Sequence, residues 1–367
     1  MGIVQKVSLT NEEVEGLAFE FYDESLLKSE EEKKQRRGKP IIKVIGIGGA
    51  GNNAINRMVD AGIEGVIFIA ANTDLQVLEI SKADILIPLG NDGMGAGGEP
   101  QKGEQATVES KDKIVENLKD ADMLFITAGL GGGTGTGGAP VIAEIARELG
   151  ILTVAIVTTP FYFEGNKRWK IAMEGLQKLK GKVDTLIKIS NNKLLEEVDE
   201  DMTTIDAFKK ADETLMQGIR GISELITKRG YINLDFADIN AVMRGAGTAM
   251  LGIGIGKGDN RAIDAARNAM ESRLLEQPVE NATAIILNIS APENVKLKEM
   301  HMAAAIIKQK CSDEADVRLG LIIDDSINDD EMRVTLIATG FEEDDKGLFP
   351  DNDIPAIYRM GLDWENL

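Results

Sequence analysis

The fold is decided by residues 123–138, which read MLFITAGLGGGTGTGG. The first six residues form an apolar run typical of a buried strand, and Pro140–Leu149 has a helical pattern that stops at Gly150. Glycines between a strand and a helix let the backbone wrap a phosphate closely, because no Cβ intervenes. The helix N-terminus adds its dipole, and Thr134 and Thr136 can add hydroxyl donors. The stretch therefore predicts a phosphate-binding loop, with a mobile surface loop as the alternative.

Strands and helices alternate on both sides of this loop, which indicates a parallel sheet covered by helices. The first expected strands are 41–45, 66–71, 85–88, 123–128, 153–158 and 185–189. A long helical pattern follows at 203–228, and about 24 helical residues at 1.5 Å each span roughly 36 Å. Its apolar stripe comprises Ile205, Phe208, Leu215, Ile219, Ile222 and Ile226. Further strands are expected at 248–255, 282–289, 317–323 and 333–338.

The predicted fold class is therefore α/β, with a Rossmann-like parallel-sheet domain, a long central helix and a smaller α/β domain after it. The expected parts are a flexible N-terminal extension (1–40), the first domain (41–202), the central helix (203–229), the second domain (230–340) and a linker with a terminal peptide (341–367).

A second glycine loop, GIGGAG at 46–51, directly follows a strand and matches G-x-G-x-x-G in its proper context. Alone it would indicate a dinucleotide-binding fold and an NAD-dependent oxidoreductase. That interpretation needs an acidic residue at the end of the second strand to bond the ribose, but the first side chain offered there is the amide of Asn72. It also gives no role to residues 131–137. A Walker P-loop is excluded because no G-K-[ST] occurs.

Composition narrows the function classes. A formal net charge of −20 argues against nucleic acid or an anionic membrane surface as the main partner. No apolar run approaches the roughly 20 residues of a membrane span, and the N-terminus lacks an export pattern, so we expect a cytoplasmic protein without membrane insertion. His301 and Cys311 are the only histidine and cysteine, which leaves little room for a histidine-based active site and none for an internal disulfide. No residue cluster predicts a dedicated metal site.

Six segments carry a family resemblance. The run GGGTGTG at 131–137 matches the signature of the tubulin/FtsZ family letter for letter. The segments GGAGNN (48–53), ANTD (71–74), TPFYFEGNKR (159–168), NLDFAD (233–238) and DIPAIYR (353–359) resemble FtsZ segments in the same order. The resemblance covers roughly 41–340 and the tail motif. It implies a cytoskeletal GTPase that assembles head to tail into protofilaments of the cell-division ring, with 41–202 as the GTP-binding and 230–340 as the GTPase-activating domain.

The resemblance also implies the nucleotide site, which would bind GTP or GDP. The implied phosphate-binding residues are Gly48, Gly49, Ala50, Gly51, Asn52, Asn72, Gly131, Gly132, Gly133, Thr134, Gly135, Thr136 and Gly137. Asp212 would face guanine, whose two donors on one edge suit a single carboxylate. Taken alone, an acid such as Asp212 is more often a solvated helix residue, and it is the resemblance that favours the base contact. Phe208 would lie against the base, and the remaining implied contacts are Pro160, Glu164, Arg168 and Asn191.

Asp235 and Asp238 are three residues apart at a predicted helix start, so both can project from one turn. Taken alone, they read as an N-cap and its partner. The resemblance implies that the two carboxylates enter the next subunit's pocket and polarise the water that attacks the γ-phosphate, with Asn233 seating the loop and Mg²⁺ on the phosphates. A non-hydrolysing structural relative is the alternative, and both acids speak against it.

The tail segment Asp353–Arg359 resembles the peptide by which this family docks on a membrane-anchoring division protein of the FtsA or SepF type. Its proline and apolar residues within an acidic tail suit a short recognition segment. A disordered end without a partner is the alternative.

Overall fold

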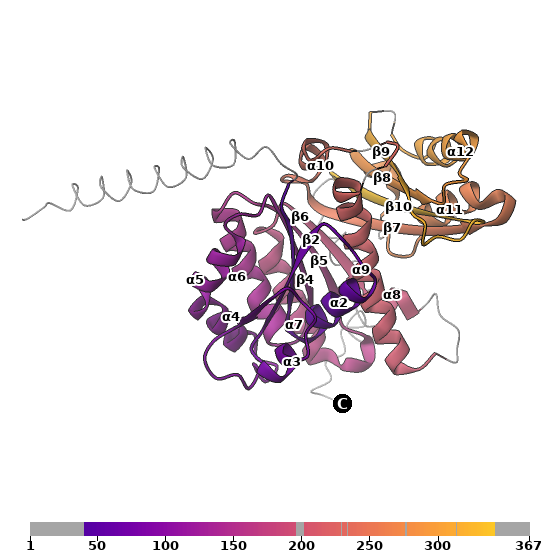
Figure 1. Ribbon diagram of the computed structural model, residues 1–367. Coiled ribbons are helices and arrows are strands. Elements are labelled where there is room, and N and C mark those ends of the chain that lie inside the picture. The colour runs from indigo at the N-terminus through magenta and orange to yellow at the C-terminus, as the bar shows by residue number, and fades with distance from the viewer. Residues whose placement is uncertain are drawn as a thin grey trace, which may run out of the picture. The chain divides into compact units, whose positions relative to one another are not determined.

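The expected alternation of strands and helices is present in the computed structural model (Figure 1). The structure describes residues 40–195, 202–228, 230–232, 234–275, 277–312 and 314–341. Four expectations lie outside the described residues: the N-terminal extension up to residue 39, Asn233, the linker from residue 342 and the tail peptide Asp353–Arg359.

Every strand expected from the sequence is present, with ends that differ by at most two residues. They are β1 (Ile42–Ile47), β2 (Val66–Asn72), β3 (Ile85–Pro88), β4 (Met123–Gly129), β5 (Leu152–Thr159), β6 (Thr185–Ser190), β7 (Gly247–Lys257), β8 (Ala284–Ala291), β9 (Asp316–Ile323) and β10 (Glu331–Thr339). They form a 10-stranded sheet in the order β3-β2-β1-β4-β5-β6-β7-β10-β8-β9. Strands β1 to β6 pair in parallel, as the alternation with helices predicts.

Strand β7 belongs to both halves of the sheet. Its first residues, Gly247–Ala249, pair in parallel with β6, and Met250–Lys257 pair antiparallel with β10. The sheet therefore continues across the point where the sequence predicts the second α/β unit, and the expected domain boundaries stay predictions.

The helices are α2 (Gly48–Asp60), α3 (Leu75–Glu79), α4 (Pro100–Glu109), α5 (Lys111–Leu118), α6 (Thr134–Glu148), α7 (Asn166–Lys180), α8 (Asn191–Leu195), α9 (Thr204–Thr227), α10 (Phe236–Met243), α11 (Arg261–Met270) and α12 (Leu297–Lys308). The long helix is present as α9. The helix expected at Pro140–Leu149 begins earlier, at Thr134, so that Pro140 lies inside it.

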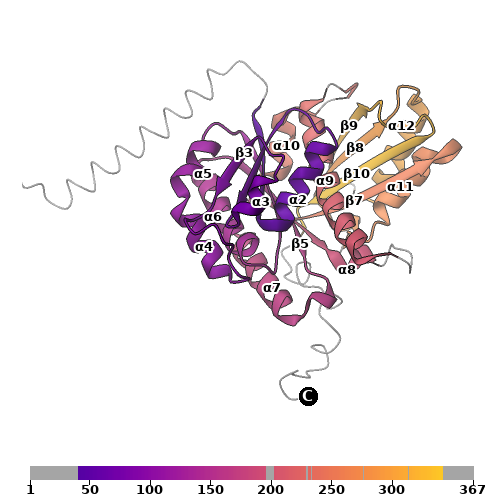
Figure 2. The ribbon, with the colours of Figure 1, turned by 60° about the horizontal axis from the view of Figure 1, so that its bottom comes forward.

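Two layers of helices cover the parallel strands (Figures 1 and 2). Within β1, Val44 packs into the core that α2 and α9 cover, and Ile45 packs into the core that α5, α6 and α7 cover. A strand buried on both faces reads as a largely apolar run. In β1 the exception is the buried Lys43, whose Nζ donates to Asp120 Oδ1 at 2.5 Å. A third core joins α11 and α12 to β8, β9 and β10.

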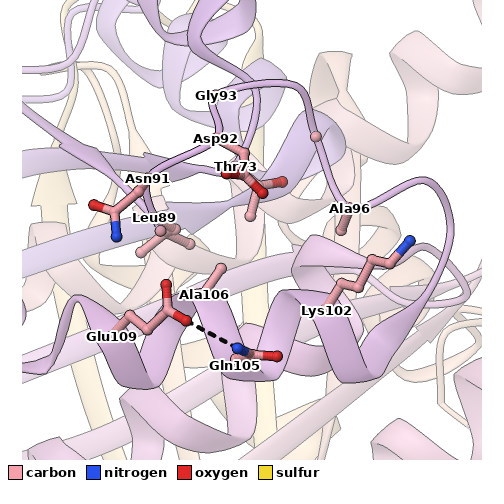
Figure 3. A pocket seen from close by; sticks show the side chains of 12 residues that line it. Thr73, Leu89, Asn91, Asp92, Gly93, Ala96, Lys102, Gln105, Ala106 and Glu109 are labelled. Carbon is pink, nitrogen blue, oxygen red and sulfur yellow. Dashed lines mark hydrogen bonds between the residues drawn. The ribbon is translucent and has the colours of Figure 1, made fainter.

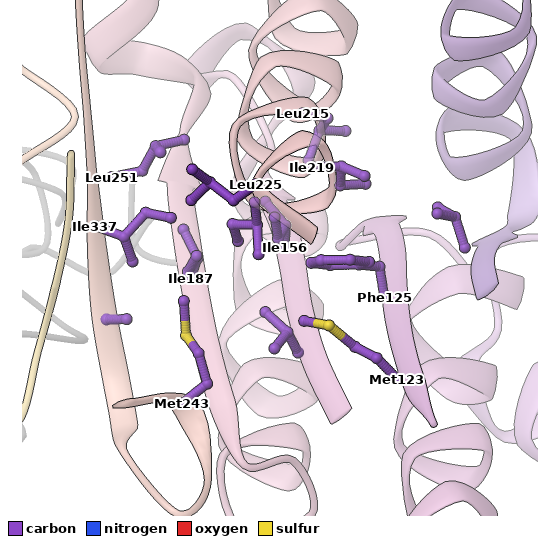
Figure 4. Close-up of a cluster of buried hydrophobic side chains, with 14 of the residues drawn as sticks. Met123, Phe125, Ile156, Ile187, Leu215, Ile219, Leu225, Met243, Leu251 and Ile337 are labelled. Atoms are coloured by element: carbon purple, nitrogen blue, oxygen red, sulfur yellow. The ribbon is translucent and has the colours of Figure 1, made fainter. Parts of the chain in front are cut away.

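Helix α9 contributes the centre of the first core. Leu215 and Ile219 are at most 1% exposed, and they face Phe125 of β4 and Ile156 of β5 (Figure 4). The N-terminal end of the predicted stripe is not buried, because Ile205 is 69% exposed. The first part of the stripe therefore lies at the surface, which leaves the start of α9 available for a site.

Candidate functional site

A cavity of about 260 Å³ lies where β1, β4, β5 and β6 end at their carboxyl sides. Parallel α/β sheets bind ligands at this edge. Most of the residues that line it were predicted from the sequence: Gly48, Gly49, Ala50, Gly132, Gly133, Thr134, Gly135, Pro160, Glu164, Arg168, Asn191, Phe208 and Asp212. The sequence did not predict the others, which are Ile47, Gly129, Leu130, Thr158 and Ala211. Residues from positions 47 to 212 thus meet around one cavity.

The glycine loop before α6 forms one wall, and its glycines serve different purposes. A Cβ added at Gly132 would meet nothing within 4 Å, so this residue borders open space. A Cβ at Gly133 would lie 2.8 Å from the Cβ of Ala96 and 2.9 Å from the amide nitrogen of Glu99. Gly132 therefore leaves room for a ligand, whereas Gly133 lets the protein pack behind the loop.

The N-termini of α2 and α6 meet at this cavity. Helix α2 begins at Gly48, which has φ +71°, and a Cβ there would lie 3.0 Å from the amide nitrogen of Gly135 in α6. Gly49 borders open space as Gly132 does. Free amides and the dipoles of two helices, of 13 and 15 residues, therefore face the same volume and favour an anion there.

Side-chain cations contribute little to this anion site. The described residues that line the cavity include no lysine. Their one arginine, Arg168, forms an ion pair with Glu164, which also accepts a hydrogen bond from the amide of Phe161 at 2.9 Å. The backbone is thus the main source of positive potential.

The other implied phosphate-binding residues lie behind the lining: Gly51, Asn52, Asn72, Gly131, Thr136 and Gly137. The Asn52 side chain donates to the carbonyl oxygen of Gly46 at 3.0 Å and accepts from Asn72 Nδ2 at 2.7 Å. The amide of Gly131 donates to Thr136 Oγ1 at 2.9 Å. These contacts hold the two glycine loops in shape.

The end of β2 does not suit a dinucleotide. Asn72 is buried and bonded to Asn52, and the next acid, Asp74, caps α3 by accepting from the amides of Gln76 (2.9 Å) and Val77 (3.4 Å). The ribose-binding acid that the oxidoreductase interpretation requires is therefore engaged in a helix cap.

Two buried acceptors stand at the far end of the cavity. Asp212 is 9% exposed, and its Oδ2 accepts from Arg57 Nε at 3.1 Å. Burial raises the pKa of Asp212 above its ordinary value, although the Arg57 guanidinium acts in the opposite direction. Asn191 is 5% exposed, and its Oδ1 has no hydrogen-bond partner within the described protein. An orphan acceptor of this kind fits a ligand that brings donors.

An aromatic cluster adjoins these acceptors. The ring of Phe208 is 41% exposed and packs edge-on against Phe161, with centroids 5.1 Å apart. Phe163 stacks on Phe161 with centroids 5.0 Å apart. The exposed start of α9 thus offers a flat apolar surface beside the acceptors, which suits a planar base.

The sequence reasoning missed a further glycine loop, GMGAGG at 93–98, which follows β3. Gly93, Gly95, Gly97 and Gly98 all have positive φ, and the neighbouring Ala96 lies against Gly133. The density of glycines after a strand was the signal that could have revealed it.

A cavity of about 400 Å³ lies beside this loop, between Thr73 and Asp92 on one side and Lys102, Gln105 and Glu109 of α4 on the other (Figure 3). Thr73 Oγ1 lies 2.6 Å from Oγ1 of Thr134, which lines the first cavity. This second cavity therefore adjoins the wall of the first cavity at Thr134.

Asp235 and Asp238 do not line the first cavity. They form a reciprocal capping box at the start of α10, in which Asp235 Oδ1 accepts from the Asp238 amide at 2.8 Å and Asp238 Oδ2 accepts from the Asp235 amide at 3.2 Å. The capping interpretation is thus confirmed.

Helix α10 lies at the amino edge of the sheet (Figure 1), whereas residues that follow the carboxyl ends of the strands line the first cavity. Thr185, the first residue of β6, donates to the carbonyl oxygen of Met243 at the end of α10 at 2.5 Å. The 6 residues of β6 span roughly 20 Å. The two acids are therefore remote from their own chain's cavity.

Within the described ranges, no group of three or more histidine, cysteine, aspartate or glutamate side chains is arranged to hold a metal ion. None of the helices described has the length and apolar character that crossing a membrane requires.

Known proteins resemble this chain over most of its length. Residues 41–199 match the model of the tubulin/FtsZ family GTPase domain, and residues 247–342 match that of the FtsZ family C-terminal domain. A solved dimer of FtsZ from M. jannaschii is 45% identical, with a TM-score of 0.80 over 87% of this chain and 92% of that one. CetZ1 from Haloferax volcanii, a GDP-bound monomer, shares the fold at 20% identity, with a TM-score of 0.72 over 87% of this chain and 99% of that one. CetZ2 from the same organism, solved as a GTPgS-bound protofilament, shares the fold at 20% identity. The TM-score is 0.69 over 88% of this chain and 99% of that one.

Proposed function

Because this chain belongs to the FtsZ branch of the tubulin/FtsZ family and carries its GTPase domain, we propose that it hydrolyses GTP at the contacts between head-to-tail subunits of a protofilament. The observation that supports this most is the placement of the cavity and the acid pair at opposite edges of the sheet. A head-to-tail contact joins two different surfaces and does not close on itself, so it builds an open filament.

The first cavity binds the nucleotide in this proposal, and its features fit GTP. The triphosphate takes the amides of both glycine loops, where Gly49 and Gly132 leave the open space that a phosphate needs. Behind these loops, Gly51, Asn52, Asn72, Gly131, Thr136 and Gly137 keep the cradle in shape. This explains how an acidic protein can hold a polyanion without a lysine from the lining.

Guanine takes the far end of the cavity. Its N1–H and N2 amine donate to the Asp212 carboxylate, Asn191 supplies the orphan acceptor, and the ring lies against Phe208. Adenine offers an acceptor where guanine offers N1–H, so its N1 would face the Asp212 carboxylate with no proton between the two acceptors. Pro160, Glu164 and Arg168 border the ribose.

Hydrolysis occurs when the acids of one subunit reach the nucleotide of the next. Asp235 and Asp238 polarise the attacking water, and Asn233, outside the described residues, seats their loop. Mg²⁺ bound by the phosphates would neutralise the charge that develops there. Phosphoryl transfer needs positioning and charge control rather than covalent catalysis, which suits a chain whose only histidine is His301.

The filaments serve the cell-division ring in this proposal, in the cytoplasm at the division site. Residues 41–202 form the GTP-binding domain, and 230–340 the domain that activates its neighbour. The tail segment Asp353–Arg359, outside the described residues, docks on a membrane-anchoring division protein of the FtsA or SepF type. A tail-deleted variant tests this last point, because it should assemble normally and fail to co-sediment with the anchor.

The catalytic assignment is tested with Asp238→Ala and Asp238→Asn. Both variants should bind GTP and form filaments that sediment, while phosphate release falls by roughly a hundred-fold or more, about 2.7 kcal/mol. Asp264→Ala is the matched control, because it also removes an acid from the first turn of a helix, α11. Normal hydrolysis by both Asp238 variants would defeat the assignment.

A further inference from the structure

Asp238 has a charged partner that the catalytic proposal does not use. Arg318, in β9, donates from Nη1 to Asp238 Oδ1 at 2.5 Å. The other oxygen, Oδ2, accepts from the amide of Asp235. Both carboxylate oxygens are therefore held, each from a different direction. A carboxylate has about four lone-pair sites, so a water can still donate to it.

Arg318 is itself fixed by a second carboxylate. Its Nε lies 3.0 Å from both oxygens of Asp316, and Nη2 lies 2.9 Å from Asp316 Oδ2. The planar guanidinium suits such forked contacts, which also fix its orientation. The result is a chain of charges that runs from Asp316 through Arg318 to Asp238.

Backbone hydrogen bonds hold β9, the strand that carries Arg318, beside the segment that leads into α10. The amide of Tyr231 donates to the carbonyl oxygen of Leu321 at 3.1 Å, and the amide of Leu321 donates to that of Ile232 at 2.9 Å. Gly320 packs against Leu225 of α9, where a Cβ would lie 2.3 Å from Cδ2 of that leucine. Strand β9 is therefore tied to the segment between α9 and α10.

We propose that Arg318 is a positioning residue for GTP hydrolysis: it holds the Asp238 carboxylate in the orientation that meets the nucleotide of the neighbouring subunit. The inference rests on the proposed catalytic role of Asp238. Asp235 and Asp238 lie in one helical turn and repel each other, and the Arg318 guanidinium, which attracts both carboxylates, offsets this repulsion. A carboxylate held before assembly needs no reorganisation when the neighbour docks. Asp316 in turn orients Arg318.

The test separates turnover from assembly. Arg318→Met should lower the phosphate-release rate per assembled subunit roughly ten-fold. The critical concentration, measured by sedimentation with GTPγS, should stay within about two-fold of wild type, because Arg318 acts through Asp238 and not through the filament contact. Arg318→Lys should recover part of the rate, since it keeps the charge but loses the fork. Asp316→Asn should fall between Arg318→Met and wild type.

Arg244→Met is the matched control. Arg244 lies at the other end of the same helix, where its Nε donates to Asn240 Oδ1 at 2.9 Å, so its loss should leave turnover unchanged. An unchanged rate in Arg318→Met overturns the inference, and so does a loss of rate that a raised critical concentration fully explains.

A double-mutant cycle decides whether Arg318 acts through Asp238. In an Asp238→Asn background, Arg318→Met should have no further effect on the residual rate. A further ten-fold loss there would mean that Arg318 acts on the phosphate directly, which overturns the positioning role. Full GTP turnover by the Asp238→Asn variant alone would refute the proposed function itself. If Asp238→Asn loses turnover but Arg318→Met keeps it, only this inference is refuted.

Discussion

The environment of Asp212 depends on a residue far away in the sequence. A helix acid taken alone is usually solvated, yet here the carboxyl is 9% exposed and bonded to Arg57. Arg57 is 155 residues away along the chain. No local pattern around Asp212 encodes that partner, so its burial could not be predicted from the sequence.

The raised pKa of Asp212 predicts a pH dependence of nucleotide binding. In the proposed site, the charged carboxylate of Asp212 accepts two hydrogen bonds from guanine, whereas the protonated form presents a donor of its own. As the pH falls, Asp212 takes up its proton at a higher pH than an ordinary aspartate. The affinity for fluorescent GDP should therefore decrease on mild acidification, as measured by titration at a series of pH values.

Two variants serve as controls. Arg57→Gln removes the cation that opposes the rise in the pKa of Asp212, so the loss of affinity should begin at a higher pH. Asp212→Asn should bind more weakly throughout and lose this pH dependence. An affinity that stays constant with pH in the wild type, or an equal pH dependence in Asp212→Asn, would rule out the role of Asp212.

At the scale of elements, the strands were predicted closely and the start of α6 was not. Hydrophobic periodicity and apolar runs depend only on neighbouring residues, so the sequence can locate strands well. Every strand lies within two residues of its expected ends. Helix α6 begins among glycines, which are poor helix formers. Packing overrides this preference, because a Cβ at Gly137 would lie 2.0 Å from the carbonyl oxygen of Pro100 in α4. The helix starts where α4 supports it.

The glycine loop permits a paired prediction. Gly133→Ala forces a Cβ against Ala96 and Glu99, so the free energy of unfolding of the nucleotide-free protein should decrease by about 1–3 kcal/mol. Gly132→Ala projects into open space, so it should leave that stability unchanged and weaken GDP binding roughly ten-fold, about 1.4 kcal/mol. Denaturant unfolding and nucleotide titration measure the two effects. The reverse pattern would mean that the phosphates bind elsewhere.

At the scale of the whole molecule, the distance between the first cavity and the acids Asp235 and Asp238 keeps the two parts of the proposed site apart within one subunit. Helix α9 carries Asp212 near its start and ends at Thr227, shortly before Asp235. The 15 residues that follow Asp212 in the helix span roughly 22 Å. A helix of this length keeps both groups apart within one subunit, as the proposed head-to-tail assembly requires.

This arrangement predicts complementation between two inactive variants. Asp238→Ala keeps the cavity and lacks an acid, whereas Asp212→Ala keeps the acids and binds guanine poorly. Each alone should release little phosphate, and an equimolar mixture should recover activity wherever an Asp212→Ala subunit presents its acids to an Asp238→Ala cavity. Phosphate release and sedimentation are measured together. A mixture that co-assembles but shows only the sum of the separate rates would place the complete site within one subunit.

The sequence by itself determined the strands, the long helix α9 and the two glycine loops, because periodicity and glycine geometry act over a few neighbouring residues. Only the tertiary structure decided that Arg57 meets Asp212, that Arg318 meets Asp238 across 80 residues, and that the loop at 93–98 packs behind Gly133. Those contacts follow from the order of strands in the sheet. That order depends on how distant apolar surfaces are buried together, which no short stretch of sequence specifies.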